Sequence, residues 1–275
     1  MFETVVDRLS ERILRYLNRP TGRYAPFFAP DIEVVRQSLK PCDVLLVEGN
    51  TRISAVIKYL TQSTWSHTCL YIGDALGPDP SGGEARVLIE AEAGAGVIAV
   101  PLSKYAHFNK RICRPIGLSD DDRKKVIAYA VARIGTQYDS RRIVDLARYL
   151  FPYPPVPMWL RRRMLAIGAG DPTKAICSAL IAEAFGSIHY PILPERVDVG
   201  GKSYGIAPYV QREIDHIRKH GLYTPRDFDI SPYFAVIKPT IESGFDCHAL
   251  KWEPDPADQV AGGSGQGFRS GSTAT

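Results

Sequence analysis

A cysteine at the start of a predicted helix raises the first chemical question in this sequence. In "GAGDPTKAICSALIAEAFGS" (168–187) a loop rich in Gly, Asp and Pro leads into an apolar helical pattern, and Cys177 lies where that pattern begins. A lone buried cysteine is usually a small apolar packing residue. A helix N-terminus, however, stabilises a thiolate, which becomes a nucleophile if a base takes its proton. Both interpretations of Cys177 are open from these residues.

His67 is the best-placed base among six histidines. It begins the apolar strand pattern "SHTCLYIGD" (66–74), and a rigid strand holds a side chain better than a loop does. His216 and His220 share one face of a predicted helix, but no Glu lies between them and no third ligand is evident, so we interpret them as a solvated face. The remaining histidines lie in loop-like or peripheral segments: His107, His189 and His248.

A third polar group must orient the imidazole and fix its tautomer. Glu90 and Glu92 follow on the next predicted strand and, being two positions apart, point to the same face. Either can serve by this criterion. For Glu92 an ordinary surface carboxylate is the favoured interpretation.

These residues need strands and helices to position them. Apolar runs bounded by turn residues predict strands at 43–49, 66–74, 85–92, 96–102, 110–116 and 231–239. The middle strands are expected to form an antiparallel meander. Helical patterns are expected at 51–63, 119–135, 141–151, from Cys177 onward and around 208–220, and the first twenty residues predict an amphipathic helix that ends near Pro20.

Composition restricts the class of protein. With 275 residues, 45% hydrophobic and 23% charged, the chain can bury a full core. A net charge of +4 without basic and aromatic residues interleaved gives no reason to infer a nucleic-acid partner. The five cysteines include no C-x-x-C pair, which argues against a disulfide framework or a zinc knuckle and for a reducing compartment. No signal peptide or membrane span is evident, so a cytoplasmic location is expected.

Ordered motifs in this chain resemble those of a known family. "DVLLVEG", "WSHTCLYIGD", "VLIEAEAGAGVIAVPLSKY", "IGTQYDS", "ICSALIAEAF" and "TPRDFDISPYFAVI", between residues 41 and 239, resemble the circularly permuted NlpC-like, papain-type cysteine hydrolases, the YiiX-like group. In that family the histidine strand precedes the acid and the cysteine helix comes last. The resemblance implies that Cys177 is the nucleophile, His67 the general base and Glu90 the orienting acid.

The resemblance is not complete around the cysteine. The family often has Tyr before the cysteine and Glu two residues after it, whereas this chain has Ile176 and Ala179, so oxyanion support or substrate choice can differ. Tyr138 matches a family element that we interpret first as structural, with a contact near the site. Trp65 and Ser178, which lie close to His67 and Cys177 in the sequence, are further candidates for substrate contact.

The expected fold is α+β and papain-like, with an antiparallel sheet packed against the nucleophile-bearing helix. We expect an N-terminal helical extension (1–40), a catalytic domain (41–258) with an insertion (151–170), and a disordered tail (259–275). The expected activity is hydrolysis of an amide or ester through a thioacyl-enzyme, with an acyltransferase or a silent binding module as alternatives. No metal or organic cofactor is implied.

Two segments bear on the substrate. Residues 1–19 and 158–165 combine apolar side chains with arginines, a mixture suited either to a packed helix with a solvated basic face or to peripheral contact with anionic lipid. A small-molecule, peptide or acyl-lipid substrate is expected. The sequence does not specify the oligomeric state.

Overall fold

The computed structural model describes residues 12, 15–22, 24–26, 30–92, 94–137, 177–194 and 223–250, without the side chains of Leu60 and Cys177. The chain divides into two units, 1–243 and 244–275. The predicted helices at 141–151 and 208–220, the insertion at 151–170 and the tail at 259–275 lie outside the described residues, as does most of the N-terminal helix. The domain borders proposed from the sequence therefore stay predictions.

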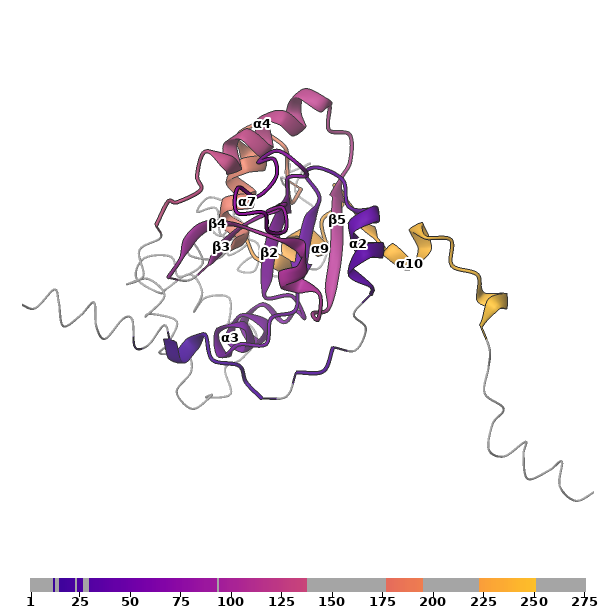
Figure 1. Cartoon of the computed structure of the whole chain (residues 1–275), viewed down its shortest axis with the longest axis horizontal. Coiled ribbons are helices and arrows are strands. Elements are labelled where there is room, and N and C mark those ends of the chain that lie inside the picture. Colours follow the sequence, from indigo (N-terminus) through magenta and orange to yellow (C-terminus); the bar gives the residue numbers. More distant parts are fainter. Residues whose placement is uncertain are drawn as a thin grey trace, which may run out of the picture. The chain divides into compact units, whose positions relative to one another are not determined.

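A six-stranded antiparallel sheet forms the centre of the first unit (Figure 1). Its strands, in chain order, are β1 (Val44–Val47), β2 (His67–Tyr71), β3 (Leu88–Glu92), β4 (Gly96–Val100), β5 (Lys110–Pro115) and β6 (Phe234–Ile237). The helices are α2 (Ile32–Ser38), α3 (Arg52–Thr61), the short 3-10 helix η1 (Leu102–Tyr105), α4 (Asp120–Val131), α7 (Cys177–Gly186), α9 (Pro225–Asp229) and α10 (Pro239–Glu242). The 3-10 helix η4 (Cys247–Ala249) belongs to the second unit. Helices with an antiparallel sheet confirm the α+β class.

The helices form where the sequence offers start signals. Ser119 caps α4, with its hydroxyl bonded to the Asp122 backbone and the Asp122 carboxylate returning to the Ser119 backbone. This reciprocal pair satisfies two backbone groups that a helix start leaves without partners. Thr51 caps α3 in a similar position. The predicted helices at 51–63 and 119–135 are confirmed, each slightly shorter than expected.

The predicted meander is correct for β1 to β4 and wrong for β5. In the sheet order β4-β3-β2-β1-β5-β6, β5 returns to pair with β1. The outer edge of β4 is already occupied, because the backbone after α4 bonds to Val97: Val97 N donates to Thr136 O at 3.0 Å and Gly135 N donates to Val97 O at 2.9 Å. A side chain at Gly96 would meet Thr136 O at 2.3 Å, so only glycine permits this close approach.

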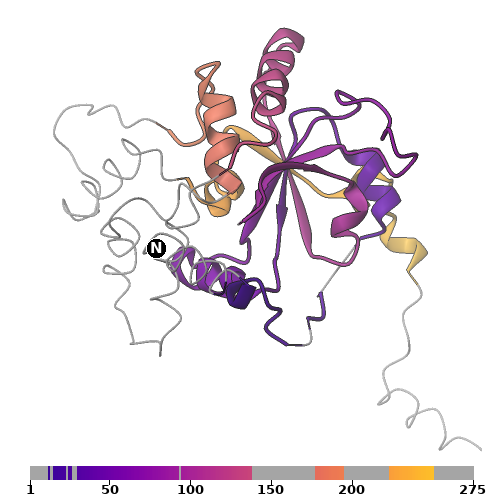
Figure 2. The same cartoon turned by 60° about the vertical axis from the view of Figure 1, so that its left-hand side comes forward.

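The two faces of the sheet bury different elements. Figure 2 shows α4 and α7 on one side of the sheet and α2 with η1 on the other. On the first side, α7 packs on β2 and β3 through Leu180, Ile181, Ala184 and Phe185, which share a core with Leu70, Ile89 and Ala91. On the second, Val35 of α2 and Leu102 of η1 pack with Leu45, Cys69 and Leu88. Successive strand residues alternate between these two cores.

Candidate active site

His67 and Glu90 meet on neighbouring strands. The antiparallel register pairs Leu70 with Ile89, which places Glu90 across from Cys69, on the side of the sheet that carries η1. His67 lies two residues before Cys69, and its Nε2 is 2.9 Å from Glu90 Oε2. The structure thus brings together the two residues that the sequence proposed as base and orienting acid.

Glu90 is fully buried and is contacted by four donor groups. Its Oε1 accepts from Lys104 Nζ at 2.5 Å. Its Oε2 lies beside His67 Nε2, accepts from Cys69 Sγ at 3.2 Å, and accepts a short hydrogen bond from the Tyr105 hydroxyl. A carboxylate has about four acceptor positions, so this one is saturated by the groups around it.

These contacts decide the charge of Glu90. Burial by itself raises the pKa of a carboxyl. Here the hydrogen bond from His67, the charge of His67 and the ammonium of Lys104 outweigh burial and hold the pKa of Glu90 well below its ordinary value. Burial lowers the pKa of Lys104, but Glu90 and Glu92 together raise it. Glu90 is therefore a carboxylate at neutral pH, and Lys104 is an ammonium.

Glu92 has a different environment. Its side chain is 43% exposed and bonds to Lys104 Nζ at 2.8 Å. The sequence could not separate Glu90 from Glu92, because both point to one face of β3. The structure places Glu90, and not Glu92, at hydrogen-bond distance from His67 Nε2.

The hydrogen bond to Glu90 also selects a tautomer of His67. A carboxylate only accepts, so Nε2 must carry the proton in that bond. Nδ1 is then the nitrogen that can take a proton from a nucleophile. The His67 side chain is 22% exposed, so the ring lies at the boundary between core and solvent.

Cys177 is the first residue of α7, as the sequence predicts for a thiol at a helix start. The side chain of Cys177 is outside the described part of the structure. The apolar side of α7 packs on the sheet face opposite the one that carries Glu90, and a contact between Cys177 and His67 at the start of β2 stays a prediction.

The three candidates for substrate contact differ in placement. Trp65 is buried in the core, and its Nε1 donates to Asp229 at 3.1 Å while Arg111 stacks over the ring. Ser178 is fully buried and donates to Tyr223 O at 2.7 Å. Tyr138 lies outside the described residues. The described contacts of Trp65 and Ser178 are structural, and their contact with a substrate stays a prediction.

Sequence reasoning gave no role to Cys69, Lys104 and Tyr105, although all three contact Glu90. Lys104 and Tyr105 occur in the quoted "VPLSKY", but neither periodicity nor composition sets them apart from an ordinary turn. The available hint is position, because a segment directly after β4 can fold back over β3.

His67, Cys69 and Glu90 each offer a ligand atom, and these atoms lie within 4.8 Å of one another. Burial raises the pKa of the Cys69 thiol to about 12, and the Lys104 ammonium already forms an ion pair with Glu90. In the structure these three side chains belong to one hydrogen-bonded network around Glu90. In the second unit, Asp246, Cys247 and His248 also lie close together, but all three are exposed.

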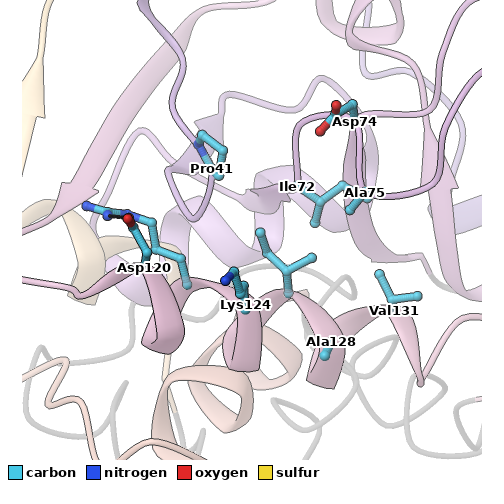
Figure 3. Close-up of a pocket in the computed structure, with 10 residues that line it drawn as sticks. Pro41, Ile72, Asp74, Ala75, Asp120, Lys124, Ala128 and Val131 are labelled. Atoms are coloured by element: carbon cyan, nitrogen blue, oxygen red, sulfur yellow. Dashed lines mark hydrogen bonds and ion pairs between the residues drawn. The ribbon is translucent and has the colours of Figure 1, made fainter.

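A surface pocket lies between α4 and the turn after β2 (Figure 3). It is lined by Ile72 and Asp74 on one side and by Asp120, Lys124 and Ala128 on the other. His67 is at the opposite end of β2, about 17 Å away at about 3.3 Å per strand residue. This pocket is therefore separate from the His67–Glu90 site.

This chain matches one family model over part of its length and is similar to a solved structure. The crystal structure of the metalloprotein yiiX from Escherichia coli O157:H7 is 17% identical, with a TM-score of 0.41 over 73% of this chain and 97% of that one. No curated protein matches the chain. In the part of the chain that the structure describes, no helix is long and apolar enough to cross a bilayer.

Residues 38–149 match the model of the permuted papain-like amidase enzymes, the YaeF/YiiX, C92 family. The matched segment contains His67 and Glu90 and ends before Cys177. At this level the match supports an amidase-type cysteine hydrolase. It confirms the resemblance to the YiiX-like group of permuted papain-type enzymes that the sequence motifs predict.

Proposed function

We propose that this protein is a cysteine-dependent hydrolase of amide or ester bonds, with Cys177 as nucleophile, His67 as general base and Glu90 as the acid that orients His67. The observation that carries the proposal is the contact between His67 Nε2 and a buried, ionised Glu90. A carboxylate that holds one imidazole nitrogen prepares the other to exchange protons with a thiol.

The reaction would proceed in two steps. Cys177 gives its proton to His67, and the thiolate attacks the substrate carbonyl carbon. The negative charge moves to the carbonyl oxygen, which the Cys177 backbone N–H at the start of α7 can stabilise. The C–N or C–O bond then breaks, and His67 returns the proton to the departing amine or alcohol. Water, deprotonated by His67, next attacks the thioacyl carbon and releases the acid and Cys177.

The acceptor and the substrate are the open parts of the proposal. Water as acceptor gives an amidase, a peptidase or an acyl-lipid hydrolase, whereas an amine or a lipid gives an acyltransferase. The arginine-containing segments 1–19 and 158–165 favour an acyl-lipid or membrane-proximal substrate. Sedimentation with vesicles, with and without anionic lipid, tests that preference, and absence of binding in both would remove it.

The pH dependence of Cys177 alkylation tests whether Cys177 and His67 act as a nucleophile and base. Iodoacetamide labelling is followed by peptide mass spectrometry, which reports each cysteine separately, so no other cysteine has to be replaced. Cys247 is exposed and serves as an internal reference thiol. Burial raises the pKa of Cys42 and Cys69 to about 12, so both should label slowly.

In the intact protein, Cys177 should label with an apparent pKa well below the ordinary value of about 8.5. His67→Ala should raise that apparent pKa, and the matched His107→Ala, at an exposed position, should not. An ordinary Cys177 that is indifferent to His67→Ala would instead support a silent binding module. A reactive Cys177 would justify screening amides, esters and acyl-lipids, with added amines to detect acyl transfer.

A further inference from the structure

The helix η1 places two consecutive side chains on the buried acid. Lys104 Nζ donates to Glu90 Oε1 at 2.5 Å, and the Tyr105 hydroxyl donates to Oε2, the oxygen that also contacts His67. The two oxygens of the carboxylate are thus each held by one of two neighbouring residues of η1. Because a carboxylate is planar, two such contacts fix its rotation as well as its position.

The backbone of η1 is itself anchored. Leu102 and Tyr105 are buried, and Lys110 of β5 donates from its Nζ to three carbonyl oxygens, those of Tyr105 (2.8 Å), Ala106 (3.0 Å) and Phe108 (2.8 Å). The three donors of the Lys110 ammonium are used in this way. The segment that presents Lys104 and Tyr105 to Glu90 is therefore tied to β5, next to the sheet.

The charges around Glu90 are almost balanced. Among the described residues, the titratable groups facing it are His67 and Cys69 of β2 and Lys104 and Tyr105 of η1, while Glu92 of β3 shares Lys104. Burial raises the pKa of both the Cys69 thiol and the Tyr105 phenol, so these two donate as neutral groups. Two carboxylates then face one ammonium, so a single negative charge of this cluster is left beside His67.

We propose that Lys104 and Tyr105 are positioning residues that keep Glu90 ionised and aimed at His67. The consequence for catalysis rests on the proposed function of His67, whereas the effect on Glu90 does not. Without Lys104, the buried carboxylate would lose its full positive partner. Without the Tyr105 hydroxyl, it would lose a neutral donor on the oxygen that contacts His67.

The test measures Glu90 directly, by carboxyl 13C NMR titration of protein labelled at glutamate, with Glu90→Gln identifying the resonance. In the intact protein Glu90 should stay ionised throughout the accessible acid range. Lys104→Met should bring its titration midpoint into that range, and Tyr105→Phe should raise the midpoint by less. Lys104→Arg should restore the midpoint, because it keeps the charge.

Matched control variants remove a lysine ammonium or a tyrosine hydroxyl that does not contact Glu90. Lys124→Met deletes an exposed lysine of α4, and Tyr190→Phe deletes a hydroxyl that bonds to backbone at Ile116 and Tyr233. Neither should move the Glu90 midpoint. A folded Lys104→Met protein in which Glu90 still stays ionised throughout the accessible acid range would overturn the proposal.

The second readout is the pH profile of Cys177 alkylation in the same variants. It should shift in Lys104→Met and return in Lys104→Arg. A shifted Glu90 with an unshifted profile would disprove the link to catalysis while leaving the effect on Glu90 intact. If Cys177 is ordinary in every variant, the proposed function fails, and the Glu90 titration still decides the roles of Lys104 and Tyr105.

Discussion

Among the residues that the structure describes, two carboxylates are fully buried, and their partners differ in kind. Asp43, next to β1, is fully buried and receives two bonds from Arg114, at 2.9 and 2.8 Å, and one from the Lys40 backbone at 2.8 Å. Glu90 receives its contacts from a histidine, a lysine, a thiol and a phenol. Arginine and backbone amides do not exchange protons near neutral pH, whereas imidazole does. Burial alone therefore does not indicate function, but a buried acid beside a group that titrates does.

The largest effect is expected on stability, from breaking the ion pair between Asp43 and Arg114. Arg114→Met leaves Asp43 buried without its cation, and breaking a buried ion pair in this way typically destabilises a protein by about 3–5 kcal/mol. The free energy of unfolding in urea measures the loss. The double variant Asp43→Asn, Arg114→Met should recover part of it, because it no longer buries a bare charge. Equal stability of the single and double variants would contradict the assigned pairing.

The second-largest effect is expected on activity, from removing the charge of Glu90. Glu90→Gln keeps the size of the side chain but removes the charge that orients His67, so kcat/KM should fall about 100-fold or more. The assay uses whichever amide or ester the intact protein hydrolyses. Thermal unfolding provides the control, since a variant that is folded and inactive separates catalysis from stability. A Glu90→Gln enzyme with full activity would place the orienting acid elsewhere.

The two acids should also affect stability with opposite pH dependence. Burial raises the pKa of Asp43 above its ordinary 3.8 despite Arg114, so its charge destabilises the fold, and acidification through the raised pKa relieves this. The pKa of Glu90 is lowered, so its stabilisation is complete above the ordinary 4.5 and is lost as the pH falls below that value. Each group contributes a slope of at most about 1.4 kcal/mol per pH unit.

Urea unfolding between about pH 3.5 and pH 7 tests this prediction. Glu90→Gln should flatten the loss of stability in acid, and Asp43→Asn should make it steeper. Parallel curves for the two variants would show that the contrast between the carboxylates is wrong.

The smallest effect is expected at Glu92, which is the matched comparison for Glu90. Its side chain is 43% exposed, and solvent screens its bond to Lys104. Exposed ion pairs contribute about 0–1 kcal/mol, so Glu92→Gln should change kcat/KM by no more than about fivefold and should hardly change the unfolding free energy. A loss at Glu92 as large as that at Glu90 would make the two acids equivalent.

The positions of the strands were predicted better from the sequence than the order in which the strands pair. Apolar runs with turn residues at their ends located β1 to β6 because that pattern is local. The partner of β5 is not local: β5 pairs with β1, while the backbone of Gly135 and Thr136 bonds to β4. The residue types in 110–116 do not indicate which strand β5 pairs with.

The site was predictable to a similar extent. A period of two placed Glu90 and Glu92 on one face and could not choose between them, because both fit the pattern equally. The choice depends on η1, which places Tyr105 over Glu90 and lets Lys104 reach both acids. Since η1 has only four residues, it is too short for a periodic pattern in the sequence to indicate it.

The order of the elements has a consequence during synthesis. The groups that surround Glu90 have all been synthesised once Tyr105 is made, whereas α7, which covers Leu70, Ile89 and Ala91 on the opposite face, begins only at Cys177. At about 5–20 residues per second, the stretch between them takes on the order of ten seconds. During that interval the nascent chain presents an uncovered apolar sheet face, which is the kind of surface that chaperones bind.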